Sequence, residues 1–215
     1  MKLAGFAVLL MAAMAFVVAG CSDNSAVPVS PTDQSVGVPR PLAKSTETSF
    51  EGIMWQNLGD PGFMVDPGII KNPDGKTLFK GVQEKVIYAA VFPAGTTDLF
   101  SGNAVITLDG WADYNTGVGD FYGKLTLTPV NGGGGVWELT WHGKGTFGPL
   151  PSPVPGPGEI ASLFGPYGWT LACKGQGPGK GGDLTGMCIS METNIYCTPD
   201  FLLWTGAYTG HVKSH

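Results

Sequence analysis

The sequence predicts an all-β domain, folded as an antiparallel up-and-down β-barrel, and three observations support this fold class. Glycine and proline, with 34 and 17 residues of 215, are too frequent for a helix bundle, because both are unfavourable inside helices. Several windows alternate apolar and polar residues with the period of a half-buried strand. Short turn segments separate these windows, which favours consecutive antiparallel hairpins over parallel strands joined by helices. A two-sheet β-sandwich is the alternative.

The alternation is clearest in two windows. In residues 121–128, Phe121, Leu125 and Leu127 share one face, and in residues 136–142 Trp137, Leu139 and Trp141 do. Glycines inside such windows fit tight bends where a sheet curls on itself. Further strands are predicted at 82–92, 104–109, 169–175, 184–191 and 201–212, a helical turn at 159–164, and turns at 72–75, 93–95, 131–135 and 178–182.

Residues 1–20 have the three parts of a secretory signal peptide. Lys2 supplies a positive start, residues 3–19 form an apolar run, and small residues precede Cys21. The run is close to the lower length limit for a membrane-spanning helix, and it ends at a cysteine rather than at flanking charges. This favours a cleaved signal peptide over an uncleaved anchor.

The residues Val18-Ala19-Gly20-Cys21 resemble the lipobox of bacterial lipoproteins, with Val18 in place of the preferred leucine. The resemblance implies cleavage after Gly20, a diacylglycerol on the Cys21 sulfur and an N-linked acyl chain such as palmitate. Lipoproteins retained at the inner membrane usually carry aspartate directly after the lipidated cysteine, and here Ser22 follows Cys21. The resemblance therefore also implies a cell-envelope protein held at the outer membrane, if the cell has two membranes.

The chain divides into four segments. After the signal peptide, residues 21–48 are predicted to be the lipidated cysteine and a disordered tether, because residues 22–48 lack aromatic side chains and are rich in Ser, Thr, Pro and Val. All six tryptophans follow position 50. The β domain is therefore expected at 49–212, followed by a short tail at 213–215.

The strand rhythm of the domain also resembles that of a known group of barrels. Glycine-punctuated segments with inward tryptophans, at 119–123, 136–141 and 204–210, look like those of the calycin and allene-oxide-cyclase-like barrels. The resemblance covers residues 81–212 and implies a calycin-like barrel. It consists of strand rhythm rather than a motif, so no catalytic or ligand-contacting residue can be carried over.

Three cysteines remain after Cys21, namely Cys173, Cys188 and Cys197. In an oxidising compartment they predict one disulfide and one leftover thiol. Cys173 and Cys188 are symmetric about Lys180-Gly181, as facing residues of a hairpin would be, and this pairing is slightly favoured. Pairing of Cys188 with Cys197 across a turn at 192–193 is the alternative. The leftover thiol has no recognisable base beside it, which argues against catalysis.

Aromatic residues are the remaining candidates for a site. Five of them share the strand faces of their apolar neighbours and would line a ligand cavity, if the barrel is hollow: Trp137, Trp141, Trp169, Trp204 and Tyr208. A filled core is the competing interpretation and is favoured, because side chains can fill the interior of a small barrel.

Charge and motifs exclude several function classes. The net charge of −5, with Arg40 as the single arginine, argues against a nucleic-acid partner. No zinc, nucleophile-elbow, P-loop or dinucleotide motif is present, so neither a metal nor a cofactor is predicted.

The leading interpretation is a lipid-anchored envelope protein that binds or scaffolds without catalysis, with the membrane and another envelope protein as partners. The alternatives are a barrel enzyme, such as a cyclase or isomerase, and a carrier, each acting on a small hydrophobic ligand. A cavity above about 300 Å³ would favour these alternatives, and a buried carboxylate in it would favour the enzyme.

Overall fold

Antiparallel pairing closes the described chain, residues 46–214 of a computed structural model, into a barrel. Each ring strand pairs with its neighbours in sequence, and the first strand pairs with both the last strand and the second ring strand. The predicted all-β, up-and-down barrel is therefore confirmed, and the sandwich alternative is not. The ring strands are β1 (Thr46–Gln56), β4 (Lys76–Val91), β5 (Gly102–Asp113), β6 (Val118–Pro129), β7 (Val136–Pro149), β8 (Tyr167–Lys180), β9 (Met187–Cys197) and β10 (Trp204–Ser214).

The strands alternate between an inner and an outer face, as the sequence windows predict. In β6, Phe121, Leu125 and Leu127 are buried inside the barrel, while the polar residues between them are exposed or half-buried. Glycine makes room where a large ring crosses the interior: a Cβ on Gly119 or Gly145 would lie 2.7 or 2.6 Å from the Phe121 ring. Small residues beside large ones thus let the barrel curl around its aromatic core.

Three short elements lie outside the ring. β2 (Met64–Asp66) and β3 (Ile69–Lys71) both pair with the N-terminal half of β4, and α1 (Gly158–Ala161) lies in the loop between β7 and β8. The predicted helical turn is present but ends at Ala161. Among residues 46–214, no helix is both long and apolar enough to cross a membrane.

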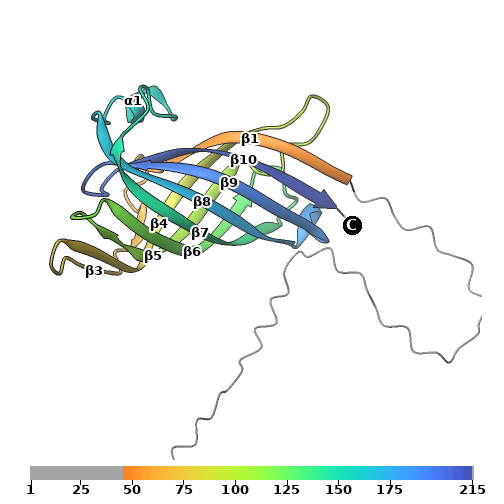
Figure 1. Ribbon diagram of the computed structural model, residues 1–215. Helices are drawn as coiled ribbons and strands as arrows, with labels where there is room; N and C mark the ends of the chain where they lie inside the picture. The colour runs from red at the N-terminus through yellow and green to blue at the C-terminus, as the bar shows by residue number, and fades with distance from the viewer. Residues whose placement is uncertain (1–45, 215) are drawn as a thin grey trace, which may run out of the picture.

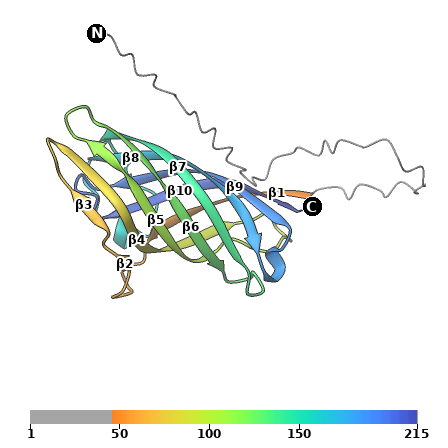
Figure 2. The same cartoon turned by 90° about the horizontal axis from the view of Figure 1, so that it is seen from below.

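The two ends of the barrel differ. Figures 1 and 2 show β3 at one end of the barrel and the end of β10 at the other, and Figure 1 places α1 at the same end as β3. We call the end with β2, β3 and α1 the mouth. The opposite end, where β1 begins, is called the closed end because the loop 92–101 packs Phe100 against Phe50, Tyr88 and Tyr208 there.

The loop between β7 and β8 has a proline at every second position from 151 to 157, and it packs against the mouth. Leu150 and Val154 are buried, and the hydroxyl of Thr205 donates a hydrogen bond to the carbonyl of Pro155 over 2.7 Å. The loop is therefore part of the wall of the mouth.

The predicted disulfide is wrong, because Cys173 and Cys197 are both free and buried. The β8–β9 register pairs Cys173 with Thr193 and Pro178 with Cys188, so Cys173 and Cys188 do not face each other. The sequence placed the hairpin turn at 178–182, but β8 continues to Lys180 and the turn follows it. The alternative pairing fails as well, since Cys188 and Cys197 lie on the same continuous strand, β9.

The ring also extends beyond the predicted domain. β1 begins at Thr46, so residues 46–48, expected in the tether, form strand, and β10 runs to Ser214 through most of the expected tail. The signal peptide, Cys21 and the rest of the tether lie outside the described residues.

Candidate functional site

A cavity of about 550 Å³ occupies the mouth of the barrel. It exists because β4 leaves the ring there: β1 pairs with β4 only from Val86 to Val91, and the earlier half of β4 pairs with β2 and β3 instead. Its deeper walls are apolar, and six ring strands contribute the lining residues Phe79, Val82, Ile106, Phe121, Leu171, Ile195 and Trp204.

One carboxylate lies in this apolar cavity. Glu84 lines it and is 9% exposed, on the inner face of β4 between Val82 and Val86. A bulge upstream sets this orientation, because the β4–β5 register shifts between Phe79 and Val82. The N–H of Gly81 in the bulge donates a hydrogen bond of 2.9 Å to Asp109 Oδ1, which holds the bulge in place.

Two donors satisfy one oxygen of Glu84. The indole Nε1 of Trp204 donates to Glu84 Oε2 over 2.6 Å, and Gln56 Nε2 donates to the same oxygen over 2.9 Å. Gln56 is fixed in turn, since its Oε1 accepts the backbone N–H of Trp204 at 2.9 Å. Within residues 46–214, no hydrogen bond reaches the other oxygen, Oε1. The site therefore presents one unused acceptor on a partly desolvated carboxylate.

The loop 198–203, between β9 and β10, covers part of the cavity. Phe201 adopts a left-handed backbone with φ of 59°, and its ring lies 5.1 to 5.7 Å from the rings of Phe79, Trp169 and Phe121. Asp200 Oδ1 accepts hydrogen bonds from the Thr198 hydroxyl at 2.6 Å and the Leu202 N–H at 3.1 Å. The Thr198 bond is the main reason that the pKa of Asp200 lies below its ordinary value. The ring of Phe201 is thus held over the cavity as a wall.

The rim of the cavity is apolar and open to solvent. Met64, Ile70 and Leu202 line the cavity and are exposed, and Val65 and Ile69 extend this apolar surface along β2 and β3. An apolar ligand would therefore meet an apolar entrance before it reaches the deeper walls.

The two free thiols are unsuited to nucleophilic chemistry. Cys197 lines the cavity, and its pKa lies well above the ordinary value, first because of burial and then because of nearby Cys173 and Glu84. Burial also raises the pKa of Cys173 to about 12. Both thiols stay protonated at neutral pH, and the thiolate is the reactive form of cysteine.

The five predicted cavity-lining residues do not meet in one place. Trp141 and Trp204 line the cavity. Trp169 lies behind it, fully buried and stacked on Phe201 at 5.3 Å. Trp137 and Tyr208 belong to the closed end, where the Trp137 indole donates to the Leu99 carbonyl over 2.8 Å and the Tyr208 ring lies 5.6 Å from that of Phe100.

Sequence reasoning missed Glu84 and Gln56. A signal existed for Glu84, because it occupies the same alternating positions as Val82, Val86 and Tyr88 and is therefore expected inside. For Gln56 the signal was absent, since β1 was not recognised as a strand.

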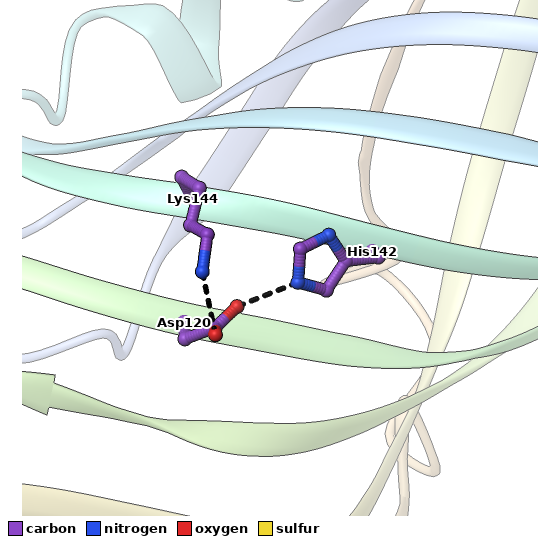
Figure 3. A network of polar contacts seen from close by, with 3 residues as sticks. All are labelled: Asp120, His142 and Lys144. Atoms are coloured by element: carbon purple, nitrogen blue, oxygen red, sulfur yellow. Dashed lines mark hydrogen bonds and ion pairs between the residues drawn. The ribbon is translucent and has the colours of Figure 1, made fainter.

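A second polar cluster lies on the outer face of the barrel. Figure 3 shows Asp120 on β6 in contact with two residues of β7, His142 and Lys144. His142 Nε2 lies 2.7 Å from Asp120 Oδ1, and Lys144 Nζ lies 2.7 Å from Asp120 Oδ2. The side chains of His142 and Lys144 are 58% and 68% exposed. His142 therefore lies on a solvated outer face, and the cluster is an exposed ion-pair group.

No family model, curated protein or solved structure matches this chain. A barrel fold alone does not determine an activity, so the function of this chain must be inferred from the geometry of the cavity.

Proposed function

We propose that this chain is a lipid-anchored envelope protein whose barrel binds a small hydrophobic ligand at its mouth. The cavity of about 550 Å³ with apolar deep walls carries the proposal. Such a volume falls within the range of small-molecule sites, roughly 300–1,000 Å³. A scaffold needs no such space, so the cavity supports ligand binding over pure scaffolding.

The direction of the mouth fits an anchored binding protein. The ring begins with Thr46 at the closed end, opposite the mouth (Figure 1). An anchor on Cys21 would join the barrel at Thr46, so the attachment to the membrane would leave the mouth unobstructed. Ligand would then enter from the side of the aqueous compartment or of a partner protein.

The anchor is tested through the sulfur of Cys21. Globomycin, which blocks cleavage of lipoprotein precursors, should change the mobility of the protein, and Cys21→Ser should release it from the membrane fraction. Cys173→Ser, at a free cysteine of the barrel, is the matched control and should remain membrane-bound. Unchanged mobility together with unchanged partitioning of Cys21→Ser would contradict the anchor.

Ligand binding is tested by tryptophan fluorescence, because Trp141 and Trp204 line the cavity. Titration with a panel of lipid-like compounds should give a saturable change with at least one of them. Leu108→Trp places a large ring at the cavity wall and should weaken binding, whereas Thr107→Trp, on the outer face of the same strand, should not. A flat response across the panel would contradict the proposal.

Glu84 favours a second candidate, an enzyme acting on a hydrophobic substrate, because a carboxylate in an apolar cavity can accept a proton. The hydrogen-bond partners of Glu84, Gln56 and Trp204, are not themselves proton-transfer groups. Mass spectrometry of a ligand recovered after incubation separates the candidates. A changed ligand, with the change abolished in Glu84→Gln, supports the enzyme, and an unchanged ligand supports the carrier.

A further inference from the structure

We infer that the cavity selects apolar ligands whose polar end donates a hydrogen bond, an alcohol or a protonated amine, over ligands that end in a carboxylate. This inference rests on the proposed function, because it names the ligand class of the same cavity. The selecting group is Glu84, and the deciding observation is which of its two oxygens the protein already uses.

The two donors that contact Glu84 are both used on one of its oxygens, whereas Trp141 Nε1, a buried donor of the cavity lining without a partner among the described residues, does not hydrogen-bond to Glu84. The side-chain N–H groups of Trp204 and Gln56 both reach Glu84 Oε2, at 2.6 and 2.9 Å. Gln56 is 1% exposed and lies behind Glu84 rather than on the cavity surface. Oε1 is therefore the polar atom of this network left for a ligand, and a carboxylate oxygen only accepts hydrogen bonds.

Charge at the rim points in the same direction. Asp200 lines the cavity and adds a second negative group. Lys76 is the one cation among the lining residues, but its Nζ lies 3.5 Å from Asp113 Oδ2 and 5.6 Å from the centre of the Trp111 ring. Because Asp113 offsets the charge of Lys76, the cavity as a whole does not attract an anion.

Ligand chemistry follows from these contacts. A hydroxyl or ammonium group beside Oε1 gains a charge-assisted hydrogen bond. A ligand carboxylate at the same place brings a like charge to a partly desolvated site and has no proton to donate, so either it binds weakly or it must take up a proton.

The test compares three probes with the same alkyl chain: decanol, decylamine and decanoate, each below its micelle concentration at neutral pH. Titration of the tryptophan fluorescence should show decanol and decylamine binding about tenfold or more tighter than decanoate, since tenfold corresponds to one hydrogen bond of ordinary strength. Equal or tighter binding of decanoate by the wild-type protein overturns the inference and leaves the proposed function intact.

Glu84→Gln tests the residue itself. The glutamine oxygen can still accept the indole N–H of Trp204, but the negative charge of the side chain is removed. The preference for decanol over decanoate should therefore fall to about threefold or less. Glu159→Gln, on the exposed α1, is the matched control and should keep the wild-type preference. A preference unchanged in Glu84→Gln overturns the inference. If none of the three probes binds the wild-type protein, the proposed function fails, and the inference fails with it.

Discussion

The two ends of the barrel use the same residue types for different purposes. At the closed end, the Phe100 ring lies 5.0 to 5.6 Å from the rings of Phe50, Tyr88 and Tyr208, and these side chains fill the interior. At the mouth, the rings of Trp141 and Trp204 line a cavity of about 550 Å³. Aromatic content therefore does not distinguish a packed end from a hollow one.

Strand closure makes the difference. At the closed end, β1 pairs with β4 and with β10, so the walls converge on the core. Toward the mouth, β4 separates from β1 beyond Val86, and its bulge turns Glu84 inward. The hollow end thus holds a buried carboxylate that the packed end lacks among the described residues, and we expect stability to depend on one end and binding on the other.

The largest effect is expected from Phe100→Ala at the closed end. Phe100 has no exposed surface, and its removal would leave a void among three rings. The free energy of unfolding, measured by denaturant titration, should fall by about 3–5 kcal/mol. Phe147→Ala, at a residue that is 41% exposed, should cost much less. Equal losses in the two variants would contradict the distinction between a packed core and its surface.

Gln56→Leu should follow in size, and it tests the polar network of the mouth. The substitution leaves the buried backbone N–H of Trp204 without its acceptor, and it removes the donor that Gln56 supplies to Glu84. Each unsatisfied buried group costs about 1–3 kcal/mol, so denaturant unfolding should show a loss of about 2–4 kcal/mol. Gln83→Leu is the control, because Gln83 is next to Glu84 in the sequence but lies on the outer face of β4. A comparable loss in Gln83→Leu would argue against the network.

The barrel fold was predictable because apolar and polar residues alternate without interruption in several strands. Windows 121–128 and 136–142 lie inside β6 and β7. β1 was missed because Gly52 interrupts the series of inward-facing apolar residues between Phe50 and Met54. A Cβ at Gly52 would lie 2.5 Å from the Tyr208 hydroxyl, so the barrel requires glycine where the pattern expects an apolar side chain.

The candidate site was only partly predictable. Trp141 and Trp204 have inward positions that the alternation reveals, but alternation says nothing about whether rings touch each other or enclose a cavity. The separation of β4 from β1 depends on long-range pairing, which periodicity does not contain. The disulfide prediction failed for a related reason, because Pro178 and Gly179 were interpreted as a turn and instead lie in β8.

Phe201→Ala is expected to affect binding more than stability. The ring is half-buried and packs on Phe79, so its loss should cost about 2 kcal/mol, less than the loss of Phe100. Because the ring forms a wall of the cavity, ligand should dissociate several-fold faster in stopped-flow dilution. Leu202→Ala, at a residue that is 74% exposed on the same loop, is the control for stability. Unchanged dissociation in Phe201→Ala would show that this wall does not retain the ligand.

The smallest effect is expected from Asp120→Asn on the outer face, remote from the features that distinguish the two ends. Lys144 is the main cause of the lowered pKa of Asp120, and His142 adds to it, while burial opposes both. A carboxyl whose pKa is lower in the folded state stabilises the protein above its unfolded pKa of about 3.9, and this stabilisation is lost as the pH falls below that value.

Urea unfolding should therefore show Asp120→Asn less stable at pH 7 by under about 1 kcal/mol, since exposed ion pairs contribute little. The difference from the wild-type protein should shrink as the pH falls below about 4. Asp74→Asn, at an exposed turn, should show neither effect. A difference that grows on acidification would have the wrong sign. A loss as large as that of Gln56→Leu would mean that the outer face, and not the interior, carries the stability of the barrel.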